Sequence, residues 1–213
     1  MTAALLTLAD SRLPAGGHTH SGGVEQAIAA GVVSDPGSLA AFLRRRLNTS
    51  GAVAAGLAAA ACDAAGDAVR LAHLDDEADA RTPSPALRTA SRQQGRGLLR
   101  VGRRAWPAAA WDALPAFPHH PIVLGVAAAA GGLGVRDAAQ VAAYLSISGP
   151  ATAAQRLLAM DPLTVAAVTA RLAPDIDDVA ARALAAALPA ATDPLLDLLA
   201  EVHAARKDRF FAS

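Results

Sequence analysis

Residues 122–130 read Ile-Val-Leu-Gly-Val-Ala-Ala-Ala-Ala, nine residues with no polar side chain among them. A helix that is apolar on every side is buried in the interior of a protein, so this stretch predicts a central buried helix. Residues 131–134, Gly-Gly-Leu-Gly, are expected to end it, because glycine is unfavourable inside a helix. The fold is therefore expected to be built around this helix.

The rest of the chain shares this helical character. Of its 213 residues, 53% are hydrophobic but only 3% are aromatic, so the apolar content is mostly Ala, Leu and Val. Ala and Leu are the strongest helix formers, and no run of alternating β-branched residues predicts a strand. We expect an all-α fold, a bundle of roughly eight to ten helices, in a single domain over residues 1–213.

Glycine and proline divide the predicted helices. Ser21 is a candidate N-cap for a short helix with Glu25 in its first turn. Residues 48–51 are a candidate break, and Gly149-Pro150 is expected to break the chain. The predicted helical ranges are 3–10, 24–30, 36–47, 52–65, 67–80, 86–105, 122–130, 136–148, 151–160, 162–172, 174–188 and 193–207.

The predicted helix at 86–105 contains three glycines, Gly95, Gly97 and Gly102. Each costs about 1 kcal/mol relative to alanine inside a helix. We expect a compensating reason for them, and close packing against another backbone is the one that fits best.

The same helix carries Arg92, Arg96 and Arg100 at intervals of four residues, so they line one face. That face is either solvated or a surface for an acidic partner, because arginine is common in interfacial ion pairs.

Charge and cysteine usage exclude several classes of protein. Lys plus Arg equals Asp plus Glu, at 19 each, so no overall charge favours nucleic acid. Cys62 is the only cysteine, which rules out an intramolecular disulfide and fits a reducing compartment. The first ten residues do not resemble a signal peptide, and the Ala-rich stretch at 51–65 is a weak membrane span. We expect a cytoplasmic protein without nucleic-acid or membrane partners.

A glycine-rich loop at 16–23 precedes the second predicted helix. Such loops can bind phosphates, but this one lacks the Gly-Lys-Ser/Thr of a P-loop and follows no strand. Ser21 beside His20 would be a hydrolase pair, but no Gly-x-Ser-x-Gly turn carries it. We therefore expect no catalytic residue, no cofactor site and no enzyme activity.

Two histidine pairs, His18/His20 and His119/His120, are candidate metal ligands, since imidazole suits nickel and zinc. Neither pair has a further ligand at a recognised spacing, so surface or packing roles are the alternative. No metal site is assigned. The end of the chain, 204–213, carries Phe210 and Phe211. Aromatic side chains at a terminus either dock on the body of the protein or anchor a partner.

The order of several motifs resembles the urease accessory protein UreF family. The first runs from Leu5 to Glu25 as Leu-Leu-x-Leu-Ala-Asp-Ser-x-Leu-Pro-x-Gly-Gly-x-Thr-His-Ser-x-Gly-x-Glu. The others, in chain order, are Gly95-x-x-Leu98-Leu99, His119-x-Pro121-Ile122-Val123-x-Gly125, Tyr144-Leu145, Ala153-Ala154-x-Arg156-Leu157, and the terminal Arg209-x-Phe211-x-Ser213. The chain departs from the family at His18, where Phe or Tyr is usual, and at Gly22.

The resemblance implies an all-α protein, commonly dimeric, that binds the accessory protein UreD (also called UreH) and the GTPase UreG. That assembly delivers nickel to apo-urease with GTP hydrolysis by UreG, so this chain would bind neither a nucleotide nor a cofactor of its own. The alternative is a direct nickel carrier that uses the histidine pairs. The resemblance implies these partner-binding residues: Pro14, Gly16, His20, Ser21 and Glu25 in the loop, and Arg209, Phe211 and Ser213 in a tail that orders when UreD binds.

Overall fold

The computed structural model describes residues 3–10, 12–15, 17–185 and 187–213, and these form helices with no strand among them. The all-α prediction is confirmed. Within this part of the chain, nine of the eleven α-helices have ten or more residues, which matches the expected number. They are α1 (Ala3–Ala9), α2 (Val24–Ala29), α3 (Pro36–Arg46), α4 (Ala52–Asp63), α5 (Ala68–Ala80), α6 (Pro85–Ala105), α7 (His120–Ala130), α8 (Val135–Leu157), α9 (Pro162–Arg171), α10 (Ala173–Arg182) and α11 (Pro194–Ala205).

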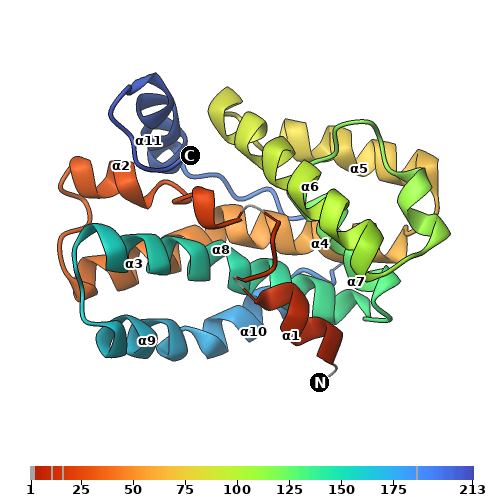
Figure 1. Ribbon diagram of the computed structural model, residues 1–213, viewed down its shortest axis with the longest axis horizontal. Helices are drawn as coiled ribbons and strands as arrows, with labels where there is room; N and C mark the ends of the chain where they lie inside the picture. The colour runs from red at the N-terminus through yellow and green to blue at the C-terminus, as the bar shows by residue number, and fades with distance from the viewer. Residues whose placement is uncertain (1–2, 11, 16, 186) are drawn as a thin grey trace.

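Helix α7 contains the stretch that is apolar on every side, and it is buried as predicted. Ile122, Val123 and Val126 have no exposed surface. The helix packs against α4, α6 and α8, and Figure 1 shows it partly behind α6. A Cβ on Gly125 would lie 2.4 Å from the carbonyl oxygen of Ala58 in α4, so only glycine allows the two helices to approach this closely.

Two of the three glycines of α6 have the predicted role. A Cβ on Gly95 would lie 2.2 Å from the carbonyl oxygen of Pro118, and one on Gly97 would lie 2.1 Å from that of Ala15. Both glycines therefore allow another backbone to pack against the helix. Gly102 instead faces a side chain, the ring of the buried Trp111.

Helix α8 runs unbroken through Gly149-Pro150, so the predicted break there is wrong. Proline has no N–H and leaves the carbonyl of Ser146, four residues earlier, without its helical donor. Nε of Arg46 in α3 donates to that carbonyl at 2.8 Å. Gly149 has no Cβ to clash with the proline ring. A contact from a distant helix therefore compensates for the proline.

The candidate break at 48–51 is a π-helical turn, Leu47–Gly51, that joins α3 to α4 without interruption. The side chain of Asn48 donates to the carbonyl of Arg44, and the hydroxyl of Thr49 donates to that of Arg45. These bonds satisfy carbonyls that a wider turn would leave free.

The helix predicted at 174–188 is shorter, because α10 ends at Arg182. The chain then runs to Asp193, whose side chain caps α11 by accepting from the N–H of Leu195 at 3.1 Å. Asp193 also pairs with Arg45 of α3. This contact fixes where α11 begins, and α11 packs on α2 and α6 (Figure 1). None of the helices in the described ranges is both long and apolar enough to cross a membrane.

Candidate functional site

The two segments that carry the predicted partner-binding residues meet in space. The C-terminal tail, residues 206–213, folds back from α11 and lies against the N-terminal loop and the start of α2 (Figure 1). The N–H of Ala212 donates to the carbonyl of Thr19 at 2.7 Å, and the N–H of Ser21 donates to the carbonyl of Ser213. His20 Nδ1 and Ser213 Oγ lie 2.6 Å apart and share a hydrogen bond. The tail therefore pairs with the loop through backbone and side-chain contacts.

Glu25 is the centre of this contact. Its side chain is buried, and Nε2 of His203 in α11 donates to Oε2 at 2.9 Å. The N–H of Phe210 donates to Oε1 at 2.8 Å, and the N–H of Phe211 donates to Oε2 at 3.0 Å. One carboxylate in the first turn of α2 thus holds both a helix and the backbone of the tail.

The electrostatics of Glu25 follow from these contacts. Burial alone would raise its pKa, because a carboxylate loses its hydration there. The hydrogen bonds from His203, Phe210 and Phe211 outweigh burial, so the pKa of Glu25 lies below its usual value. The carboxylate is therefore charged at neutral pH, when its donors are in place.

Ser21 lies in the same contact but is not the N-cap that the sequence suggested. Gly23, with φ of 87°, is the N-cap residue of α2, and no side chain caps the helix. Positive φ is a conformation that glycine adopts readily. The hydroxyl of Ser21 is fully buried, and no hydrogen-bond partner for it lies within the described residues. Its backbone, not its side chain, contacts the tail.

The remaining predicted residues lie around this centre. Phe211 is partly buried and packs against the core, whereas Phe210 is 85% exposed. Phe211 therefore docks on the body of the protein, whereas Phe210 faces solvent and is free to contact a partner. Arg209 and Pro14 are exposed, and Gly16 lies outside the described residues.

Sequence reasoning missed two residues of α11 and the tail that hold this contact. His203 lies at helical spacing from the buried Leu196 and Leu199, and a histidine on the buried face of a helix could have signalled a polar partner. Arg206 donates to Oε1 of Gln26 at 3.1 Å. Nothing in the sequence pairs these residues with α2, because about 180 residues separate them.

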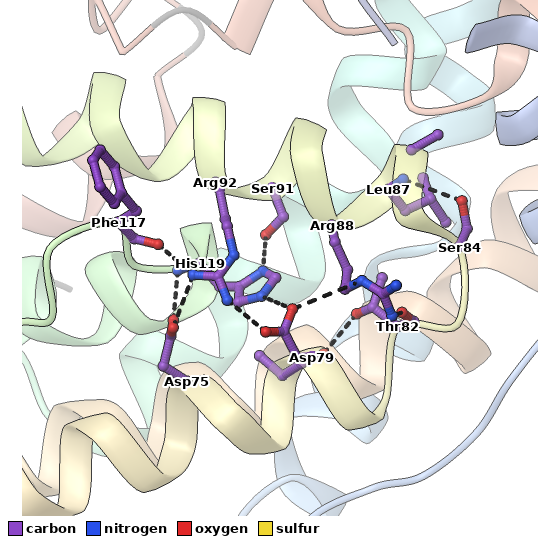
Figure 2. A network of polar contacts seen from close by, with 12 residues as sticks. Asp75, Asp79, Thr82, Ser84, Leu87, Arg88, Ser91, Arg92, Phe117 and His119 are labelled. Atoms are coloured by element: carbon purple, nitrogen blue, oxygen red, sulfur yellow. Dashed lines mark hydrogen bonds and ion pairs between the residues drawn. The ribbon is translucent and has the colours of Figure 1, made fainter. Parts of the chain in front are cut away.

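The side chains of His119 and His120 lie in different surroundings. His119 is buried between α5 and α6: Nε2 lies 2.8 Å from Oδ1 of Asp79, and Nδ1 lies 3.0 Å from Oγ of Ser91 (Figure 2). Both ring nitrogens are therefore engaged. The N–H of His119 donates to Asp75 at 2.7 Å, and Arg92 bridges Asp75 and Asp79.

The N–H of His120 also donates to Oγ of Ser91 at 3.2 Å, but its ring lies outside this network. It lines a cavity of ≈ 500 Å³ together with His20 of the N-terminal loop and Arg46 of α3. Removal from bulk water lowers the pKa of His120 to about 4, and repulsion from His20 adds to this. The side chain of His18 lies outside the described part of the chain. Within that part, no three His, Cys, Asp or Glu side chains are grouped so that they could hold a metal ion.

Cys62 is a core residue, as its Ala-rich surroundings suggest. It is buried in α4, and burial raises the pKa of its thiol to about 11. A thiol with so high a pKa is protonated and unreactive at neutral pH.

Comparison with known proteins finds one family over most of the chain. Residues 33–173, more than half of the chain, match the family model UreF. A protein of Mycolicibacterium vanbaalenii named urease accessory protein UreF is 53% identical over 211 residues, which cover 99% of this chain and 98% of that protein. Proteins of the same name from Mycobacterium sp. strain JLS and Mycobacterium tuberculosis strain H37Rv are 54% and 48% identical, and each alignment covers at least 97% of both sequences. The chain belongs to the UreF family, which includes these urease accessory proteins.

Proposed function

We propose that this chain acts in urease maturation as a scaffold that binds UreD (UreH) and the GTPase UreG and places them on apo-urease. Nickel insertion is then coupled to GTP hydrolysis by UreG, and this chain regulates that cycle. It is not itself an enzyme, it holds no cofactor, and it functions in the cytoplasm as a homodimer. Membership in the UreF family supports the pathway.

The observation that carries the scaffold role is the tail held by Glu25. Hydrogen bonds to Glu25 and to the N-terminal loop hold residues 206–213, and in this position the tail presents Phe210 to solvent at 85% exposure. Exposed aromatic side chains beside arginine are common anchors of protein interfaces. We propose that UreD binds the face formed by the tail and the N-terminal loop, and that the exposed Phe210 is its anchor. The residues of this face are Pro14, Gly16, His20, Ser21, Glu25, Arg209, Phe211 and Ser213, of which the buried Ser21 and Glu25 would act by holding the tail and the loop in position.

Co-purification tests this function directly. The full chain, expressed with the cognate UreD and UreG, is expected to elute with both proteins in size-exclusion chromatography. A Phe210→Ser variant is expected to weaken the complex with UreD at least tenfold. Leu163→Ser is the matched control, because Leu163 is 80% exposed on α9. Failure of the wild-type chain to form any complex with UreD would overturn the proposal.

A direct nickel carrier is the second candidate, and one observation favours it: His20 and His120 line the same cavity. Calorimetric titration with nickel separates the two functions. A carrier requires uptake at micromolar nickel that His20→Ala and His120→Ala variants lose. Uptake that is absent, or unchanged in the variants, rejects the carrier.

A further inference from the structure

Helix α6 (Pro85–Ala105) carries six arginines and no acidic residue. Three of the arginines form ion pairs with aspartates of neighbouring segments. Their partners are Asp79 for Arg88, Asp75 and Asp79 for Arg92, and Asp112 for Arg103.

The other three, Arg96, Arg100 and Arg104, recur every four residues and are exposed. We call them the arginine stripe. No hydrogen bond or ion pair involves them within the described residues, so their charges are uncompensated. Like charges four residues apart on one face of a helix destabilise it. The helix dipole favours Arg104 in the last turn, but its effect does not extend to Arg96 and Arg100.

Elsewhere in the described chain, arginines without a partner are scattered. Arg136 and Arg156 lie near opposite ends of α8, and Arg171 ends α9. Only on α6 do such arginines follow one another along a single face. The stripe is therefore a local concentration of positive charge on a chain whose formal net charge is zero.

The stripe borders the N-terminal loop. Gly97 directly follows Arg96, and its Cα faces the carbonyl of Ala15, since a Cβ there would lie 2.1 Å from that oxygen. Pro14, one of the proposed partner-binding residues, is adjacent to Ala15. The stripe therefore lies beside the segment of the N-terminal loop that carries Pro14.

We propose that the arginine stripe is a docking surface for an acidic protein surface. Successive members rise about 6 Å along the helix axis, and each guanidinium can bind one carboxylate through two parallel hydrogen bonds. The matching partner presents Asp or Glu side chains about 6 Å apart, as one face of a helix does. The inference rests on the proposed function, because it places this acidic surface on one of the proteins of the urease maturation assembly.

A double charge reversal, Arg96→Glu with Arg100→Glu, tests the surface. The matched control is Arg136→Glu with Arg171→Glu, which changes the net charge equally at two exposed helical arginines that also lack partners in the described chain. Dissociation constants for purified UreD and UreG are measured for each full-length variant, and circular dichroism checks that both variants keep the wild-type helical content.

The stripe variant is expected to bind one of these partners at least tenfold more weakly, and the control is expected to bind like wild type. Wild-type binding should also weaken as salt rises, because exposed charges are screened. Equal binding by the stripe variant, or equal loss in both variants, overturns the docking surface alone. Duplex DNA is titrated against the same variants, and a stripe variant that loses only DNA binding while it keeps both protein complexes overturns the docking surface as well. If wild type binds neither protein, the proposed function fails together with the docking surface.

Discussion

Glu25 is a buried carboxylate whose hydrogen-bond donors come from the other end of the chain. We expect Glu25→Gln to reduce the free energy that holds the tail against α2 by about 1–3 kcal/mol at pH 7, because charge-assisted hydrogen bonds become neutral ones. Hydrogen exchange at the amides of Phe210 and Phe211 should then quicken by roughly 5- to 150-fold relative to wild type. Glu77→Gln is the control, since Glu77 pairs with Arg81 on α5.

The difference in hydrogen-exchange rate between Glu25→Gln and wild type should depend on pH in one direction. The folded pKa of Glu25 lies below its usual value of 4.5, so the unfolded chain binds more protons than the folded chain at pH values between the two pKa values. The stabilisation by Glu25 is complete above pH 4.5 and is lost as the pH falls through the folded pKa. The ratio of exchange rates between Glu25→Gln and wild type should therefore shrink on acidification. A ratio of one at pH 7 would contradict the role assigned to Glu25.

His119 illustrates a residue whose environment removes it from metal chemistry. Both ring nitrogens are engaged, by Asp79 and Ser91 (Figure 2). His119→Ala is expected to lower the free energy of unfolding by about 1–3 kcal/mol in urea denaturation, because it removes a buried ring and its hydrogen bonds to Asp79 and Ser91. His73→Ala, at a side chain that is 73% exposed, should change it by less than about 0.5 kcal/mol. Loss of nickel uptake with unchanged stability would contradict the structural role of His119.

At the scale of elements, α6 packs closely against two different backbone segments through two of its glycines. Gly95 faces the backbone at Pro118, a segment anchored by Asp75, whereas Gly97 faces the surface loop at Ala15. Gly95→Ala should cost about 1–3 kcal/mol in urea denaturation, because an anchored backbone cannot yield to the added methyl group. Gly97→Ala should cost less, because the loop can shift. An equal cost for the two variants would show that the loop is as rigid as the anchored segment.

At the scale of the whole molecule, the tail closes the chain on itself but contributes no helix. Deleting residues 209–213 is expected to leave the helical content unchanged, because this segment contains none, and to abolish UreD binding. Circular dichroism and co-purification measure the two effects. The point variant Phe211→Ala keeps the backbone bonds to Glu25 and should weaken UreD binding less than the deletion does. If the shortened chain unfolds, the tail belongs to the core and is not an interface.

The sequence by itself determined the all-α class, the buried α7 and the close backbone contacts at Gly95 and Gly97. Each of these follows from local composition, which acts within a few residues along the chain. The order of motifs also indicated the UreF family, which the comparisons confirm.

Only the tertiary structure decided that α8 continues through Pro150, that His119 belongs to a buried network, and that the tail is held by Glu25. The physical reason is the same in each case. The compensating group, Arg46, Asp79 or His203, comes from another helix. A backbone carbonyl, an imidazole or a carboxylate gains a partner through the fold, and local sequence does not encode which partner that will be.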